Sequence, residues 1–157
     1  MSSAKLRRGR YSVAHATYAV TVVLRHRDPL FARDPVAVAT RECLRMCDKE
    51  GISRTHAWVL MPDHLHWLFE LREGSLSRCL CRFKSRSARG VNQLLNTHGP
   101  VWQPGFYDHR VRVEEDLRRQ ARYFIANPIR ACLVTDLHEY PHWGCRWIAR
   151  DDDSDAS

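Results

Sequence analysis

The chain has 157 residues, which is enough for one domain with a hydrophobic core and short for two. No apolar stretch approaches the roughly 20 residues of a membrane helix, and no signal-peptide core follows the basic N-terminus. We therefore expect a cytoplasmic protein with no membrane contact. The net charge of +7, from 25 Lys and Arg against 18 Asp and Glu, favours a polyanionic partner, with nucleic acid preferred to a membrane surface.

The six cysteines are Cys43, Cys47, Cys79, Cys81, Cys132 and Cys145. None of them forms a CxxC pair, and a reducing cytosol keeps thiols free. A zinc-stabilised module that uses His138, His142 and Cys145 is an alternative, although this spacing matches no zinc finger well. Free thiols are therefore the prediction.

Charge divides the chain into three parts. Residues 1–10 form a basic arm, residues 11–148 form a single domain, and residues 149–157 form an acidic tail. The tail is predicted to be disordered because its residues are charged and carry little apolar surface. It either solubilises the protein, which is the simpler interpretation, or covers a basic DNA groove and inhibits it.

The first half of the chain predicts three strands and one helix. The β-branched and aromatic run 11–25 is the first strand. Asp34 and Pro35 suit a helix start, and a helix is expected over 35–49. Strands over 53–61 and 64–72 follow, and the tight turn Pro62-Asp63 joins them into a hairpin.

The second half predicts two helices on either side of a strand. Ser75 caps a long helix over 76–96. The alternating segment 106–113 is a strand, and three acidic residues then open a helix over 114–126, where a helix N-terminus favours negative charge. Pro128 ends that helix.

This order of elements predicts an α+β fold. Strand, helix, two strands, helix and strand form a ferredoxin-like split βαβ arrangement: an antiparallel four-stranded sheet with two packing helices. The helix over 114–126 is then an added C-terminal helix. The fold hosts many functions, so it decides none of them.

The triplet His64-Leu65-His66 is the first candidate for chemistry. On a strand both imidazoles leave the backbone on one side, while an apolar row occupies the other side. That row is Leu65, Trp67, Phe69 and Leu71. Two imidazoles at this spacing make half of a metal site, but spacing alone better suits two histidines on a polar strand face.

Tyr123 and Asn127 are the second candidate. They lie four residues apart and therefore on one face of the last helix. His64, His66 and the amide oxygen of Asn127 can together hold Mg²⁺ or Mn²⁺ as a Lewis acid for a phosphate. The phenol of Tyr123 can then attack the phosphorus and form a covalent phosphotyrosine.

The other tyrosines lack this arrangement. Tyr11, Tyr18, Tyr107 and Tyr140 have no amide or acid one helical turn after them, as Tyr123 has. His109 shares the apolar side of its strand, so we interpret it as structural. Tyr123 is therefore the predicted nucleophile.

Basic residues on two segments are candidates for binding DNA phosphates. The helix over 76–96 carries charges of almost one sign, which makes phosphate contact as good an interpretation as a merely solvated face. Arg110 and Arg112, on the strand over 106–113, are expected to flank the cleavage site. The helix residues are Arg78, Arg82, Lys84, Arg86 and Arg89.

Five segments together resemble the REP-associated tyrosine transposases, within the single-tyrosine HUH transposases of bacterial insertion sequences. They are MPDHLHWLFEL, FKSRSARGVNQLL, VWQPGFYDHRVR, YFIANPIRACLV and YPHWGCRW. The resemblance extends over residues 10–147. One departure is Cys132, where the family more often has Gly, and this affects packing rather than chemistry.

The resemblance implies cleavage and strand transfer of single-stranded DNA hairpins through a 5′-phosphotyrosine. His64 and His66 match the metal ligands of the family, Tyr123 its nucleophile and Asn127 its amide-bearing third ligand. A monomer is favoured over a helix-exchanged dimer, and a bacterial, nucleoid-associated location is implied. A domesticated relative that binds hairpins without cutting them is the alternative function.

Overall fold

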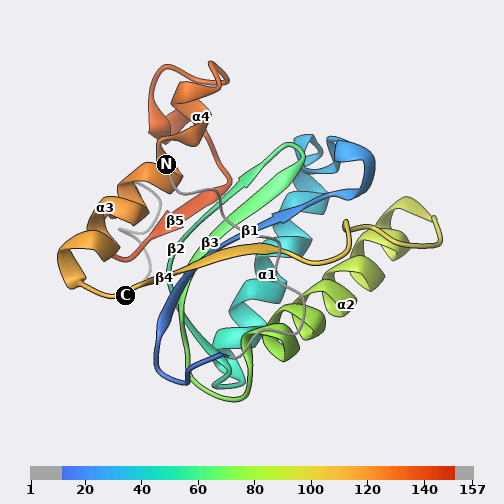
Figure 1. The fold of residues 1–157 in the computed structure, drawn as a ribbon. Coiled ribbons are helices and arrows are strands. Elements are labelled where there is room, and N and C mark those ends of the chain that lie inside the picture. Colours follow the sequence, from blue (N-terminus) through green and yellow to red (C-terminus); the bar gives the residue numbers. More distant parts are fainter. Residues whose placement is uncertain (1–11, 151–157) are drawn as a thin grey trace.

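Five strands form one antiparallel sheet in the computed structural model, which describes residues 12–150 (Figure 1). The strands are β1 (Thr17–Val23), β2 (Ser53–Met61), β3 (His64–Leu71), β4 (Tyr107–Val111) and β5 (Trp143–Cys145). Their order across the sheet is β4-β1-β3-β2-β5. The predicted basic arm, and the predicted tail beyond Arg150, lie outside the described residues.

Four α-helices accompany the sheet. They are α1 (Asp34–Lys49), α2 (Leu76–Leu95), α3 (Glu114–Ile125) and α4 (Asn127–Arg130). Short 3-10 helices occur at Arg25–Arg27, Leu30–Ala32 and Leu137–Glu139. No helix within residues 12–150 has the length and apolar character needed to cross a membrane.

The predicted α+β class with an antiparallel sheet is confirmed, but the predicted number of four strands is wrong. The fifth strand, β5, pairs with the outer edge of β2. With only three residues and a central glycine, it carries no alternation that the sequence could reveal. The first strand is also shorter than predicted, because His15 has a positive φ just before it.

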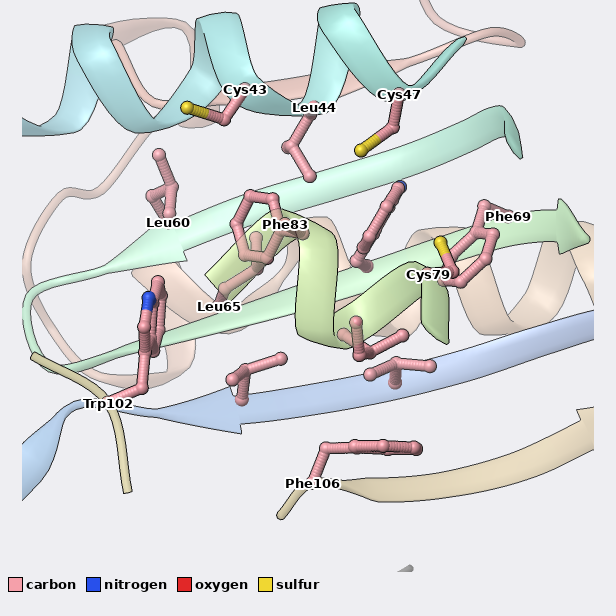
Figure 2. Close-up of a cluster of buried hydrophobic side chains, with 14 of the residues drawn as sticks. Cys43, Leu44, Cys47, Leu60, Leu65, Phe69, Cys79, Phe83, Trp102 and Phe106 are labelled. Atoms are coloured by element: carbon pink, nitrogen blue, oxygen red, sulfur yellow. The ribbon is translucent and has the colours of Figure 1, made fainter. Parts of the chain in front are cut away.

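One face of the sheet packs on α1 and α2. The apolar row of β3 lies entirely on this face, as its alternation predicted, and Leu65, Trp67 and Phe69 are each 0% exposed. Figure 2 shows this core, with Cys43 and Cys47 of α1 above β2 and β3 and Phe83 of α2 beside them. The histidines of β3 are thereby directed to the opposite face.

The opposite face is covered by α3 and the C-terminal segment. Ala19 of β1, Leu68 of β3, Phe124 of α3 and Trp143 of β5 belong to this second core. In Figure 1, α3 lies across the sheet from α1 and α2. The helix that carries Tyr123 therefore shares a face with His64 and His66, which is the arrangement that a divided active site requires.

Buried polar contacts fix the C-terminal segment to the body. The hydroxyl of Tyr140 donates to the carbonyl of Leu60, and burial raises the pKa of Tyr140 to about 12. His142 and Asp34 lie 2.7 Å apart through Nε2 and Oδ1. This contact joins His142 to the first residue of α1. Within residues 12–150 no group of three or more His, Cys, Asp or Glu is placed to hold a metal, so the zinc alternative gains no support.

Gly144 allows β5 to pair with β2 beside a large side chain. A Cβ at this position would overlap the indole nitrogen of Trp58 and lie 3.0 Å from its Cε2. We expect Gly144→Ala to lower the free energy of unfolding by about 1–3 kcal/mol, because Trp58 or β5 must move. Denaturant titration followed by circular dichroism measures this.

Gly90 provides the matched control for Gly144. It lies within α2, and an added Cβ there meets nothing within 4 Å. Gly90→Ala should instead raise the free energy of unfolding by about 0.4–1 kcal/mol. Equal effects of the two substitutions would show that β5 has no tight contact at Gly144.

Candidate active site

Both imidazoles of the His64/His66 pair are oriented by a hydrogen bond at Nδ1. Nδ1 of His64 lies 2.6 Å from Oδ1 of Asp63, and Nδ1 of His66 lies 2.9 Å from Oγ1 of Thr21. Asp63 comes from the β2–β3 turn, and Thr21 faces His66 in the β1–β3 register. When a carboxylate or hydroxyl oxygen accepts a hydrogen bond from Nδ1–H, the neutral ring carries its proton on Nδ1 and its lone pair on Nε2.

The two Nε2 atoms face each other at 3.1 Å. Lone pairs that face each other at this distance need a proton or a cation between them. Two nitrogens that bind one ion on adjacent positions, each at about 2.1 Å, lie about 3 Å apart. His64 and His66 therefore fit a shared divalent metal ion.

Burial favours the neutral imidazole of His66, and the neutral form is the one that binds metals. Burial, with smaller contributions from the nearby charges of His64 and Arg130, lowers the pKa of His66 to about 3 against the opposing effect of Asp63. Burial also raises the pKa of Asp63, but His64 and Arg27 outweigh this and bring it below its usual value. Asp63 is thus a charged anchor for His64.

Helix α3 packs directly on His66. The ring of Phe124 stacks on the imidazole, with centroids 4.6 Å apart and planes at 17°. Tyr123, the preceding residue, is 48% exposed. An open groove of about 850 Å³ is lined by both His66 and Tyr123, between α3 and β4. The structure thus brings the predicted nucleophile and one predicted metal ligand to the same groove.

Asn127 and Arg130 hold the end of the tyrosine helix. Nδ2 of Asn127 donates to the Phe124 carbonyl at 2.9 Å, so its Oδ1 is the atom suited to a metal. The guanidinium of Arg130 donates to the Tyr123 carbonyl at 2.7 Å, and its Cζ lies 4.1 Å from the centre of the Tyr123 ring. Arg130 therefore constrains both the backbone and the ring of Tyr123.

The prediction that His109 lies on a covered, apolar side of its strand is wrong. It is exposed, lines the groove and lies 3.1 Å from Oε1 of Gln120 through Nε2. The strand β4 is at the sheet edge, so its alternating residues are not covered as they would be in a central strand. Sequence reasoning also missed Thr21 and Arg130, which become visible only through contacts across the fold.

The predicted DNA-binding residues occupy two separate places. Arg110 and Arg112 line the groove that contains Tyr123, as expected of residues near a cleavage site. The basic residues of α2 are on the layer that covers the other face of the sheet. Arg82 and Arg86 form ion pairs with Glu50 at 3.2 and 2.6 Å. The positive charges of these two arginines are therefore already paired within the protein. Arg78 and Arg89 are exposed.

Lys84 has a structural contact that its sequence position did not reveal. Its ammonium donates to the carbonyls of Gln103 and Gly105 at 2.7 and 2.5 Å, and burial lowers its pKa. It thereby ties α2 to the segment that leads into β4. Two of the three ammonium donors of Lys84 are therefore engaged within the protein, and one is left for a phosphate.

Replacing Lys84 with Met should lower the free energy of unfolding by about 1–3 kcal/mol, because two carbonyls lose a charged donor. Arg89→Met, at an exposed position of the same helix, is the control and should leave stability unchanged. Chemical denaturation of both variants measures the difference. Identical unfolding midpoints for the two would mean that the Lys84 contacts do not stabilise the fold.

Comparison with known proteins identifies the family of this chain. Residues 12–124 match the family model described as "Transposase IS200 like". The chain belongs to this family. Membership of a transposase family implies a DNA-cleaving enzyme.

Two relatives of this IS200-like transposase share most of its length. The REP-associated tyrosine transposase of Escherichia coli is 26% identical over 134 residues, covering 84% of this chain and 78% of its own. A REP-associated tyrosine transposase solved bound to a REP hairpin has a TM-score of 0.70 at 24% identity, covering 88% of this chain and 82% of its own. The latter shows that the two chains share a fold.

Proposed function

We propose that this transposase is a metal-dependent endonuclease and strand transferase for single-stranded, hairpin-forming repeat DNA. The observation that carries the proposal is the groove shared by the exposed Tyr123 and the half-buried, neutral His66, whose Nε2 faces that of His64. A nucleophile and a metal-binding pair on one sheet face supply the two parts that phosphodiester transfer needs.

In the first step the phenol oxygen of Tyr123 attacks a DNA phosphorus, and the bond to the 3′ oxygen breaks. The phenol loses its proton to solvent, and the leaving oxygen takes a proton from solvent to become a 3′-hydroxyl. The phosphodiester energy is retained in the 5′-phosphotyrosine, so a 3′-hydroxyl can later attack it and release Tyr123. The chemistry both cuts and rejoins a strand.

His64, His66 and Oδ1 of Asn127 would hold the metal ion, with Asp63 and Thr21 orienting the imidazoles. A bound Mg²⁺ or Mn²⁺ draws charge from the non-bridging phosphate oxygens. Arg110 and Arg112 flank the groove and would contact the phosphates on either side of the cleaved bond. The solved relative with a REP hairpin supports a hairpin substrate.

Arg130 is proposed to fix the Tyr123 ring for attack, through its stacking and its hydrogen bond to the Tyr123 carbonyl. Arg130→Met should slow covalent adduct formation about 10–100-fold, while hairpin affinity changes little. Single-turnover kinetics and a binding titration separate the two quantities. Arg122→Met, at an exposed position of α3 beside Tyr123, is the control. A loss of hairpin binding alone would assign Arg130 to DNA contact instead.

A non-catalytic hairpin-binding protein on the same fold is the competing function. Incubation of a labelled hairpin bordering the gene, with and without Mn²⁺, distinguishes the two. Metal-dependent shorter products support the endonuclease, whereas a bound but intact hairpin supports the binding protein. A monomeric state and a nucleoid-associated location remain predictions, which sedimentation of the complex and imaging in cells would test.

A further inference from the structure

The segment that follows β1 holds the backbone of the turn that precedes His64. The amide of Leu24 donates to the carbonyl of Asp63 at 2.9 Å, and the amide of Phe31 donates to the carbonyl of Pro62 at 3.0 Å. Leu24 and Phe31 are both buried in the core that faces α1 and α2. In Figure 1 this segment, in blue, lies beside the β2–β3 turn. The turn is therefore anchored to the core through residues 24–31.

Arg27, from the same segment, holds the side chain of that turn. Its Nη1 donates to Oδ2 of Asp63 at 3.2 Å. The other carboxylate oxygen, Oδ1, lies 2.6 Å from Nδ1 of His64. Because each oxygen of Asp63 has its own partner, the carboxylate group loses a contact when it turns away from either one. Arg27 and His64 together define its orientation.

The backbone at this position has an uncommon conformation. His26 and Arg27 have φ of 58° and 50°, in the left-handed region that residues other than glycine seldom adopt. The amide of Arg27 donates to the carbonyl of Leu24 at 2.9 Å, which closes the reversal. Strain of this kind persists where the surrounding structure maintains it, and it collects at functional sites. Here the reversal brings Arg27 to Asp63.

We propose that Arg27 is a positioning residue for His64. By holding Asp63, it keeps the Nδ1 proton of His64 in its hydrogen bond and aims Nε2 at the position that faces His66. The consequence for a metal ion rests on the proposed function, in which this Nε2 is a ligand. The Arg27 side chain is 63% exposed, so solvent screens the ion pair and the expected effects are moderate.

The first test uses the full-length protein without metal. It measures how fast the Nδ1 proton of His64 exchanges with water, by nitrogen-15-edited NMR, with His64→Gln assigning the signal. Arg27→Met keeps a long side chain but removes the charge, and it should speed the exchange about fivefold, near the upper limit for a partly exposed ion pair. Arg27→Lys should restore most of the protection, because an ammonium group can still donate to Oδ2 of Asp63.

Arg33→Met is the control for the loss of a positive charge close to this segment. Arg33 is exposed and has no contact with Asp63 among the hydrogen bonds and ion pairs of residues 12–150, so the exchange should stay unchanged. Circular dichroism of each variant must show an intact fold. A His64 signal that is unprotected in the wild type, or equally protected in Arg27→Met, would overturn the proposal.

The second test is calorimetric titration with Mn²⁺. Arg27→Met should weaken the affinity about fivefold, which is less than the roughly 10–100-fold typical of a group that contacts the ligand directly. Hairpin affinity, measured without metal, should stay unchanged. A loss of hairpin affinity with unaltered His64 exchange would assign Arg27 to DNA contact and overturn the proposal. If the wild type bound no Mn²⁺, the metal dependence of the proposed function would fail, while the exchange rates would still decide the role of Arg27.

Discussion

Tyr123→Phe should reduce covalent protein–DNA adduct formation by a factor on the order of a thousand or more, since it removes the attacking oxygen. Hairpin affinity should stay close to that of the unaltered protein, because the hydroxyl is at an exposed position and its ring remains to stack on Arg130. Denaturing gel electrophoresis of a labelled hairpin measures the adduct, and a binding titration measures the affinity.

Tyr107 provides a matched control for this substitution. It is also exposed and lines the same groove, but it comes from β4 and lies opposite Thr21 in the sheet. Tyr107→Phe should retain adduct formation. If Tyr123→Phe formed adducts at the wild-type rate, or if Tyr107→Phe abolished them instead, the assignment of the nucleophile would be wrong.

His64→Ala and His66→Ala should each reduce cleavage by a factor on the order of a thousand, and EDTA should do the same to the unaltered protein. A metal ion supplies several kcal/mol of transition-state stabilisation, and each substitution removes one of two facing ligands. Cleavage of a labelled hairpin across a Mn²⁺ titration is the measurement.

His109→Ala is the control for the loss of an imidazole in the groove. The hydrogen bond of His109 is with Gln120 and not with His64 or His66, so metal-dependent cleavage should persist. Because His66 packs on Phe124, circular dichroism of each variant must first show an intact fold. Folded His64 and His66 variants that cut at the wild-type rate would exclude these residues as metal ligands.

The sequence predicted the structure correctly where local periodicity determines it. Alternation along β3 placed Leu65 and Trp67 in one core and His64 and His66 on the other face, and the structure confirms both. The spacing of Tyr123 and Asn127 could not by itself place Tyr123 in the same groove as His66. That placement depends on Phe124 stacking on His66, a contact between residues far apart in the chain.

Contacts between distant segments explain what the sequence could not predict. A run of same-sign charges on α2 suggested phosphate binding, but pairing with Glu50 and with backbone carbonyls engages Arg86 and Lys84 inside the fold. The same limit applies to Asp63 and Thr21. Their residue types are common in turns and strands, and only the folded chain shows that they orient the imidazoles.

The central claim is that Tyr123 becomes covalently joined to the 5′ end of a cleaved hairpin in the presence of a divalent metal. Trypsin digestion of the adduct, followed by mass spectrometry of the nucleotide-bearing peptide, tests this most directly. We predict one modified peptide that carries a 5′-phosphate link on Tyr123, formed with Mn²⁺ and absent with EDTA. Modification of another residue, or cleavage products with no covalent intermediate, would contradict the claim.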